Sequence, residues 1–84
     1  MGDVAISIRI MPDSPNVDLM KVKDEISSLA KIQDFKIEPL AFGLKALKIL
    51  VVRPDKGGGT EDLEEQIREV DGVESVEVEG VTLL

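Results

Sequence analysis

The sequence predicts an α+β fold in which two helices cover one face of a four-stranded antiparallel sheet. Four segments of the 84 residues alternate apolar with polar side chains or are apolar on both sides, as strands are. Two others repeat apolar residues at the spacing of an amphipathic helix. They follow one another as strand, helix, strand, strand, helix, strand, which is the ferredoxin-like or split βαβ plan. Because crossovers are right-handed, we expect the first and third strands in the centre.

The first strand is predicted over residues 4–10 and the first helix over about 18–31. The strand alternates, with these apolar side chains on one face: Val4, Ile6, Ile8 and Ile10. Pro12 and Pro15 mark a loop, because proline has no N–H to donate to a sheet, and an Asn or Asp there can cap the next helix. The apolar stripe of that helix is Val22, Ile26 and Leu29.

The second and third strands are predicted over residues 35–38 and 44–53. Pro39 interrupts the second strand, which suits a sheet edge or a bulge. The third strand is apolar on both faces, which favours a central position. Residues 54–59 are predicted to be loop, since three consecutive glycines maximise backbone entropy.

The second helix is predicted over about 61–70, with Thr60 as its N-cap and carboxylates in its first turns, where they complement the helix dipole. Its apolar stripe is Leu63, Ile67 and Val70. Gly72 ends the helix in a left-handed conformation, and the last strand covers residues 73–83. We expect one core between the two helix stripes and a sheet face that carries Ile6, Ile8, Leu47, Ile49 and Val78.

The composition excludes most catalytic chemistry. Ten Lys and Arg stand against 17 Asp and Glu, a net charge of −7, and Cys, His, Trp and Tyr are absent. Disulfides, thiolate metal sites, a cysteine nucleophile and histidine acid–base catalysis are therefore excluded, and we expect no cofactor. An acidic chain binds nucleic acid poorly. The longest apolar run falls far short of the ~20 residues that span a bilayer. We expect one soluble, cytoplasmic domain over residues 1–84.

Two local motifs favour ordinary structural roles. Residues 57–60 place glycines before a helix, as phosphate-binding loops do, but no Lys followed by Ser or Thr comes after the last glycine. The carboxylates at residues 61–65 lack the spacing of a calcium loop and suit a solvated helix start. Neither motif therefore predicts a phosphate or metal site.

Phe42 is one of only two aromatic residues and stands beside Gly43, between the second and third predicted strands. A buried ring would close the end of the core. An exposed ring on a rigid turn would instead be a binding hot spot. Composition and periodicity leave both interpretations open.

Two segments resemble the guanine-nucleotide exchange domain family of translation elongation factor 1-beta. They are residues 37–49 (IEPLAFGLKALKI) and residues 55–67 (DKGGGTEDLEEQI), about a third of the chain. The predicted order of elements is also that of the family. The resemblance extends over all 84 residues and is to the archaeal form of the family.

The resemblance implies guanine-nucleotide exchange on elongation factor 1-alpha, the GTPase that carries aminoacyl-tRNA to the ribosome. It implies action by protein binding without covalent chemistry, a monomer when free, and no direct binding of nucleotide, nucleic acid or membrane. It places Phe42 on a loop that wedges into the partner's nucleotide-binding domain, with Gly43 and Lys45 in the same contact. The resemblance thus favours the exposed anchor over the buried ring.

The C-terminus departs from the pattern of eukaryotic members. Their penultimate residue is a lysine that disturbs the partner's magnesium site, and Leu83 stands at that position here. A leucine cannot substitute for a cation. Either the partner's loops displace magnesium indirectly, or this end docks through apolar contacts of Val81, Leu83 and Leu84. Leu83 remains a candidate contact without a cationic role.

The alternative function is a small ferredoxin-like ligand-binding or regulatory module, because one fold supports many functions. That alternative predicts a stable homodimer and a thermal shift with a small ligand. An RNA-binding sheet would need exposed aromatics and a basic surface. The open sheet face is instead expected to carry Ala5, Ser7, Arg9, Ala46, Lys48 and Leu50. An acylphosphatase-like enzyme would need an arginine loop after the first strand, and residues 11–16 hold no arginine.

Overall fold

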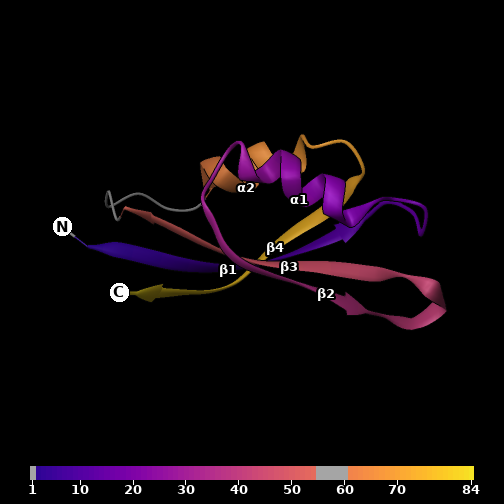
Figure 1. Ribbon diagram of the computed structural model, residues 1–84, viewed down its shortest axis with the longest axis horizontal. Coiled ribbons are helices and arrows are strands. Elements are labelled where there is room, and N and C mark those ends of the chain that lie inside the picture. The colour runs from indigo at the N-terminus through magenta and orange to yellow at the C-terminus, as the bar shows by residue number, and fades with distance from the viewer. Residues whose placement is uncertain (1, 55–60) are drawn as a thin grey trace.

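A computed structural model describes residues 2–54 and 61–84, and four strands and two helices lie in them (Figure 1). The elements are β1 (Asp3–Pro12), α1 (Leu19–Ser27), β2 (Ile32–Pro39), β3 (Lys45–Pro54), α2 (Glu61–Arg68) and β4 (Val73–Leu83). The sheet order is β2-β3-β1-β4, and every neighbouring pair is antiparallel. The predicted fold class is confirmed, with the first and third strands central and β2 at an edge.

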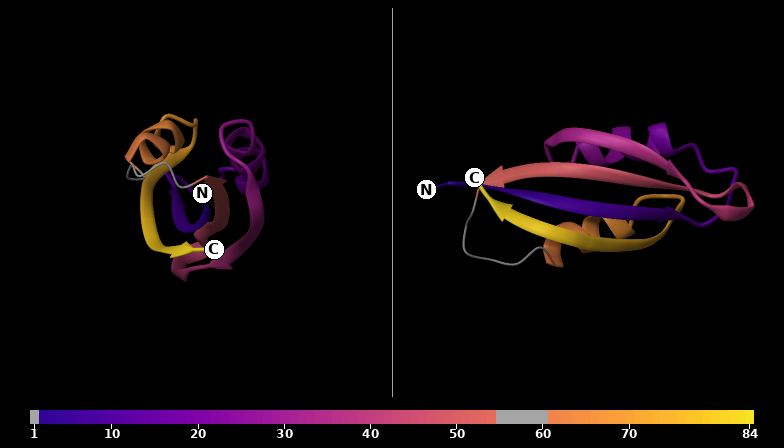
Figure 2. Two further views of the ribbon diagram at one scale, coloured as in Figure 1. Left: turned by 90° about the vertical axis from the view of Figure 1, so that its left-hand side faces the viewer. Right: turned by 90° about the horizontal axis from the view of Figure 1, so that it is seen from below.

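The core lies between the two helices and the sheet face next to them. Seen end-on, the sheet is strongly curled, with both helices on the same side of it (Figure 2). Ile8 is fully buried at its middle, where it faces Ile49 of β3 and Val78 of β4. The buried apolar side chains of this core are Val4, Ile6, Ile8, Ile10, Leu19, Val22, Ile26, Leu47, Ile49, Val51, Leu63 and Ile67.

Helix α1 begins where the sequence predicts but ends four residues early, at Ser27. Asp18 caps it, because its carboxylate accepts hydrogen bonds from the N–H groups of Met20 and Lys21. At the other end, the hydroxyls of Ser27 and Ser28 donate to the carbonyl groups of Asp24 and Glu25. Such local bonds compete with helix continuation. The predicted end at residue 31 is therefore wrong.

Leu29 is correspondingly misplaced in the predicted core. It follows the end of α1, and 45% of its surface is exposed. Strand β2 also starts earlier than predicted, at Ile32, because a register shift between Ile32 and Asp34 hides its alternation. Helix α2 ends at Arg68, two residues short of the prediction, and β4 has the predicted bounds. The expected loop glycines at residues 57–59 and the cap Thr60 lie outside the described residues.

Candidate functional site

The hairpin formed by β2 and β3 extends beyond the rest of the sheet. Strand β1 stays paired with β3 only as far as Ile10 and Leu47. The β2–β3 pairing continues to Pro39 and Lys45, so the tip of the hairpin is a two-stranded ribbon that projects at one end of the molecule (Figure 1). The sequence thus builds a protruding element at the segment that carries Phe42.

The tip of the hairpin is a tight turn, Ala41–Gly43. Phe42 has φ 61° and ψ 32°, Gly43 has φ 75°, and the N–H of Leu44 donates to the carbonyl of Ala41 at 3.2 Å. Positive φ at both central residues is the signature of a type I′ turn, in which Asn-Gly is the preferred pair. Phenylalanine in this left-handed conformation costs roughly 1–2 kcal/mol. Phe42 is also the only non-glycine residue with positive φ in the described parts of the chain.

The Phe42 ring points to solvent. Its exposed fraction is 96%, the highest among the large apolar side chains that the structure describes. The interpretation of Phe42 as a cap on the core is therefore wrong. An aromatic ring held in a strained backbone conformation and left in water contributes nothing to folding, and such strain persists mainly at functional positions. An exposed aromatic ring on a tight turn is a candidate binding hot spot.

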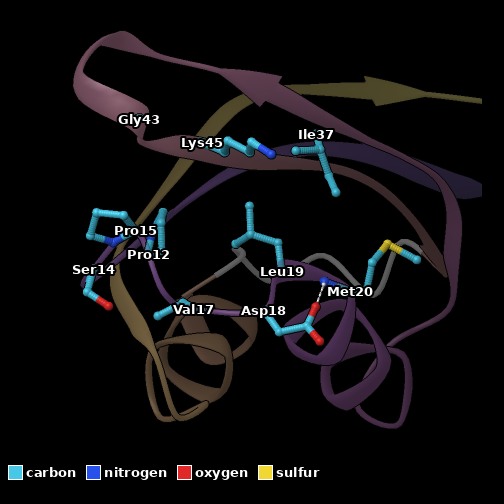
Figure 3. Close-up of a pocket in the computed structure, with 10 residues that line it drawn as sticks. All are labelled: Pro12, Ser14, Pro15, Val17, Asp18, Leu19, Met20, Ile37, Gly43 and Lys45. Atoms are coloured by element: carbon cyan, nitrogen blue, oxygen red, sulfur yellow. Dashed lines mark hydrogen bonds between the residues drawn. The ribbon is translucent and has the colours of Figure 1, made fainter.

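A pocket of about 280 Å³ lies directly beside the turn, between the hairpin and the start of α1 (Figure 3). Its lining residues are Pro12, Ser14, Pro15, Val17, Asp18, Leu19, Met20, Ile37, Gly43 and Lys45. In Figure 3, Leu19 points from α1 toward the strands that carry Ile37 and Lys45, whereas the Asp18 carboxylate turns to the N–H of Met20. Two residues singled out from the sequence, Gly43 and Lys45, thus line this pocket.

The loop on the other side of the pocket is held by backbone hydrogen bonds. The N–H of Asp13 donates to the carbonyl of Gly72 at 2.9 Å, and that of Val17 donates to the carbonyl of Ser14 at 3.3 Å. Gly72 has φ 92°, and a Cβ there would lie 3.0 Å from a methyl group of Val17. The sequence does not reveal that this loop and Met20 lie at the site, because only tertiary packing brings residues 12–20 to the hairpin. The two prolines of this loop were the one available signal.

Leu83 does not join this site. It pairs with Val4 near the start of β1, and the N–H of Leu84 donates to the carbonyl of Asp3. Both termini lie at the end of the molecule opposite the hairpin tip, and the longest extent of the protein is 42 Å (Figure 1). Leu83 is 73% exposed, beside an exposed Val81. The structure therefore separates the candidate contacts into Phe42, Gly43 and Lys45 at one end and Leu83 at the other.

On the open face of the sheet, Lys48 lies between two carboxylates. Lys48 lies 3.6 Å from the Glu38 carboxylate of β2 and 3.4 Å from that of Glu79 of β4. The alternation of the strands places Ala5 and Ala46 on this face, but both are buried.

The described residues hold no group of three or more His, Cys, Asp and Glu side chains placed to bind a metal ion. The backbone N–H of Leu63, and then Arg53 at 3.4 Å, lower the pKa of the exposed Asp62 carboxyl. No helix in the described part of the chain is long and apolar enough to cross a membrane.

Fold and site together define a small sheet-and-helix protein with a strained, exposed aromatic residue at the tip of a β-hairpin. The model of the EF-1 guanine nucleotide exchange domain matches residues 5–84. The chain therefore belongs to the EF-1 guanine nucleotide exchange domain family, and its role is guanine-nucleotide exchange in translation elongation.

Curated relatives agree with this membership. The chain is 51% identical to elongation factor 1-beta of Halorubrum lacusprofundi, over 96% of this chain and 97% of the relative. It is 45% identical to that of Methanosphaerula palustris, over 99% of each, and 42% identical to that of Archaeoglobus fulgidus, over all of each. A solved structure, the ACT domain of a Chlorobium tepidum GTP pyrophosphokinase, covers 90% of this chain and 97% of its own with a TM-score of 0.60 at 17% identity. At that identity the likeness shows the fold alone.

Proposed function

We propose that the protein accelerates release of GDP from elongation factor 1-alpha, so that GTP can rebind, and that Phe42, Gly43 and Lys45 make the contact. The observation that carries the proposal is the 96% exposure of Phe42 in a left-handed backbone conformation. The whole chain acts as one exchange unit in the cytoplasm, where translation takes place. No covalent step is needed.

The proposed mechanism is differential binding. A factor that binds the nucleotide-free partner more tightly than the GDP-loaded partner lowers the affinity for GDP by the same factor. Exchange then requires a rigid contact that distorts the nucleotide site of the partner. The turn supports such a contact, because its backbone is closed by hydrogen bonds from Leu44 to Ala41 and from Leu40 to Leu44. Gly43 permits the turn, and Lys45 supplies a cation at the pocket beside the turn.

The direct test is stopped-flow release of a fluorescent GDP analogue from the matching elongation factor 1-alpha. We expect the protein to speed release and to weaken the affinity for GDP by about 5–150-fold. GDP alone should neither bind the free protein nor shift its melting temperature. An unchanged release rate at saturating protein would refute the proposal. The alternative of a ligand-binding module rests on fold likeness, and a stable homodimer with a small-molecule thermal shift would support it instead.

The C-terminal end provides a separate prediction. If Leu83 docks on the partner through apolar contact, Leu83→Lys should slow exchange by about 3–10-fold, since burying an unmatched ammonium is unfavourable. Thr82→Lys is the matched control, because it adds the same charge on the opposite face of β4 and should have a smaller effect. Equal rates for both variants would remove Leu83 from the contact. Faster exchange with Leu83→Lys would show that a cation at this position acts on the partner.

A further inference from the structure

The pocket beside Phe42 has no role in the function proposed so far. It is lined by the β1–α1 loop, the first turn of α1 and the base of the hairpin tip (Figure 3). We propose that this pocket receives an aliphatic side chain of the partner GTPase that is flanked by a carboxylate. The inference rests on the proposed function, because it names what the partner presents at the same contact.

Polar and apolar atoms share the lining of the pocket, and apolar side chains form part of its walls. Pro12 and Leu19 are buried, and Val17 and Ile37 are half-buried at its walls. Met20 stands at the rim with 41% of its surface exposed. A volume of about 280 Å³ lies at the lower limit of cavities that hold drug-sized ligands, so a single side chain fits it better than a cofactor does. Removing such a side chain from water would stabilise the complex.

The positive charge of Lys45 at the rim favours a particular kind of partner residue next to the aliphatic side chain. Lys45 is exposed, and no ion pair to it is found in residues 2–54 and 61–84, whereas Lys48 of the same strand contacts two carboxylates. Asp18 also lines the pocket, but its carboxylate accepts hydrogen bonds from the first turn of α1. A cation that is unpaired within the described residues, at the rim of a pocket with apolar walls, therefore favours an aliphatic residue with an Asp or Glu beside it.

The pocket is continuous with the Phe42 anchor, since Gly43 belongs to both the turn and the pocket wall. A ring that projects and a pocket that recedes stand side by side, so the partner must offer a matching cavity and a matching side chain. The ring and the pocket together fix one orientation of the two proteins in the complex, whereas the ring alone would let the partner rotate about it. The hydrogen bonds that hold residues 13–17 keep the pocket open without a partner, which reduces the entropy cost of binding.

Two variants with matched controls test the pocket by stopped-flow GDP release. Met20→Arg places a long cationic side chain at the rim, and Lys45→Glu reverses the selecting charge. Each should raise the concentration for half-maximal release by about 10-fold or more. Leu29→Arg changes a similarly exposed apolar residue that follows the other end of α1, and Lys31→Glu makes the same charge change as Lys45→Glu. Both controls should stay near the wild-type value, and circular dichroism confirms that each variant is folded.

Cross-linking identifies the occupant. The chain has no cysteine, so Met20→Cys carries a single benzophenone probe, and Leu29→Cys is the control. The Met20→Cys probe should label a partner segment with an aliphatic residue next to Asp or Glu. Replacing that Asp or Glu of the partner by lysine should then restore the exchange activity of the Lys45→Glu variant. Labelling of a segment without such a pair, labelling of a second copy of this chain, or wild-type behaviour of both pocket variants would overturn the inference. If the wild-type protein itself fails to release GDP, the proposed function fails instead.

Discussion

Replacing Phe42 by asparagine is expected to stabilise the free protein and to slow nucleotide exchange. Asn-Gly is the preferred pair of a type I′ turn, and asparagine tolerates the left-handed conformation that Phe42 adopts at φ 61°. The substitution removes backbone strain and exposes no core, so the free energy of unfolding should rise by about 1 kcal/mol. For a domain of this size, that change raises the melting temperature by roughly 4–8 °C.

The same substitution removes the ring that we propose as the anchor. Loss of an interface hot spot costs about 2 kcal/mol or more, so the apparent affinity for the partner should fall by about 30-fold. Thermal unfolding and stopped-flow GDP release on one preparation measure both effects. A gain in stability with unimpaired exchange would show that the exposed ring is not the contact.

Phe35 is the matched control, because it is the only other aromatic residue. It lies on β2 with 40% of its surface exposed, and the ammonium group of Lys23 lies 4.6 Å from its ring centroid. Phe35→Ala should lower the free energy of unfolding by about 1 kcal/mol, since it removes partly buried area and a cation–π contact. Exchange should be unchanged. The two aromatics would then differ in the sign of their effect on stability and in whether they affect exchange.

The largest expected effect on stability is that of Ile26→Ala. Ile26 is fully buried on α1, facing the sheet, and the variant leaves a cavity in the core. Truncations of this kind cost about 2–5 kcal/mol, a large share of the roughly 5–15 kcal/mol that stabilises a typical domain. Urea unfolding should show a much lower midpoint with an unchanged slope.

Leu29→Ala provides the comparison within the same predicted stripe. Leu29 is 45% exposed, so its truncation should cost less than about 1 kcal/mol. The helical spacing that places Ile26 and Leu29 on one face predicts similar losses for the two. A loss at Leu29 as large as that at Ile26 would mean that the helix continues past Ser27 in solution.

The order of elements, the central positions of β1 and β3 and the edge position of β2 could be predicted, because periodicity, prolines and right-handed connection are local or general rules. The end of α1 could not be predicted from the sequence. There, the hydrogen bonds of two serine hydroxyls and the start of β2 outweigh the continuing apolar pattern. The start of β2 was also hidden, because its register shift interrupts the alternation that marks a strand.

For the site, the sequence by itself determined which residues resemble a known contact: Phe42, Gly43 and Lys45. It did not determine whether the Phe42 ring is buried, because a lone aromatic beside glycine fits a core as well as a surface. Only the tertiary structure decided that the ring is exposed on a left-handed turn. Only the tertiary structure placed Met20 and the β1–α1 loop beside it and Leu83 at the far end, since such distances arise from chain packing and leave no periodic trace in the sequence.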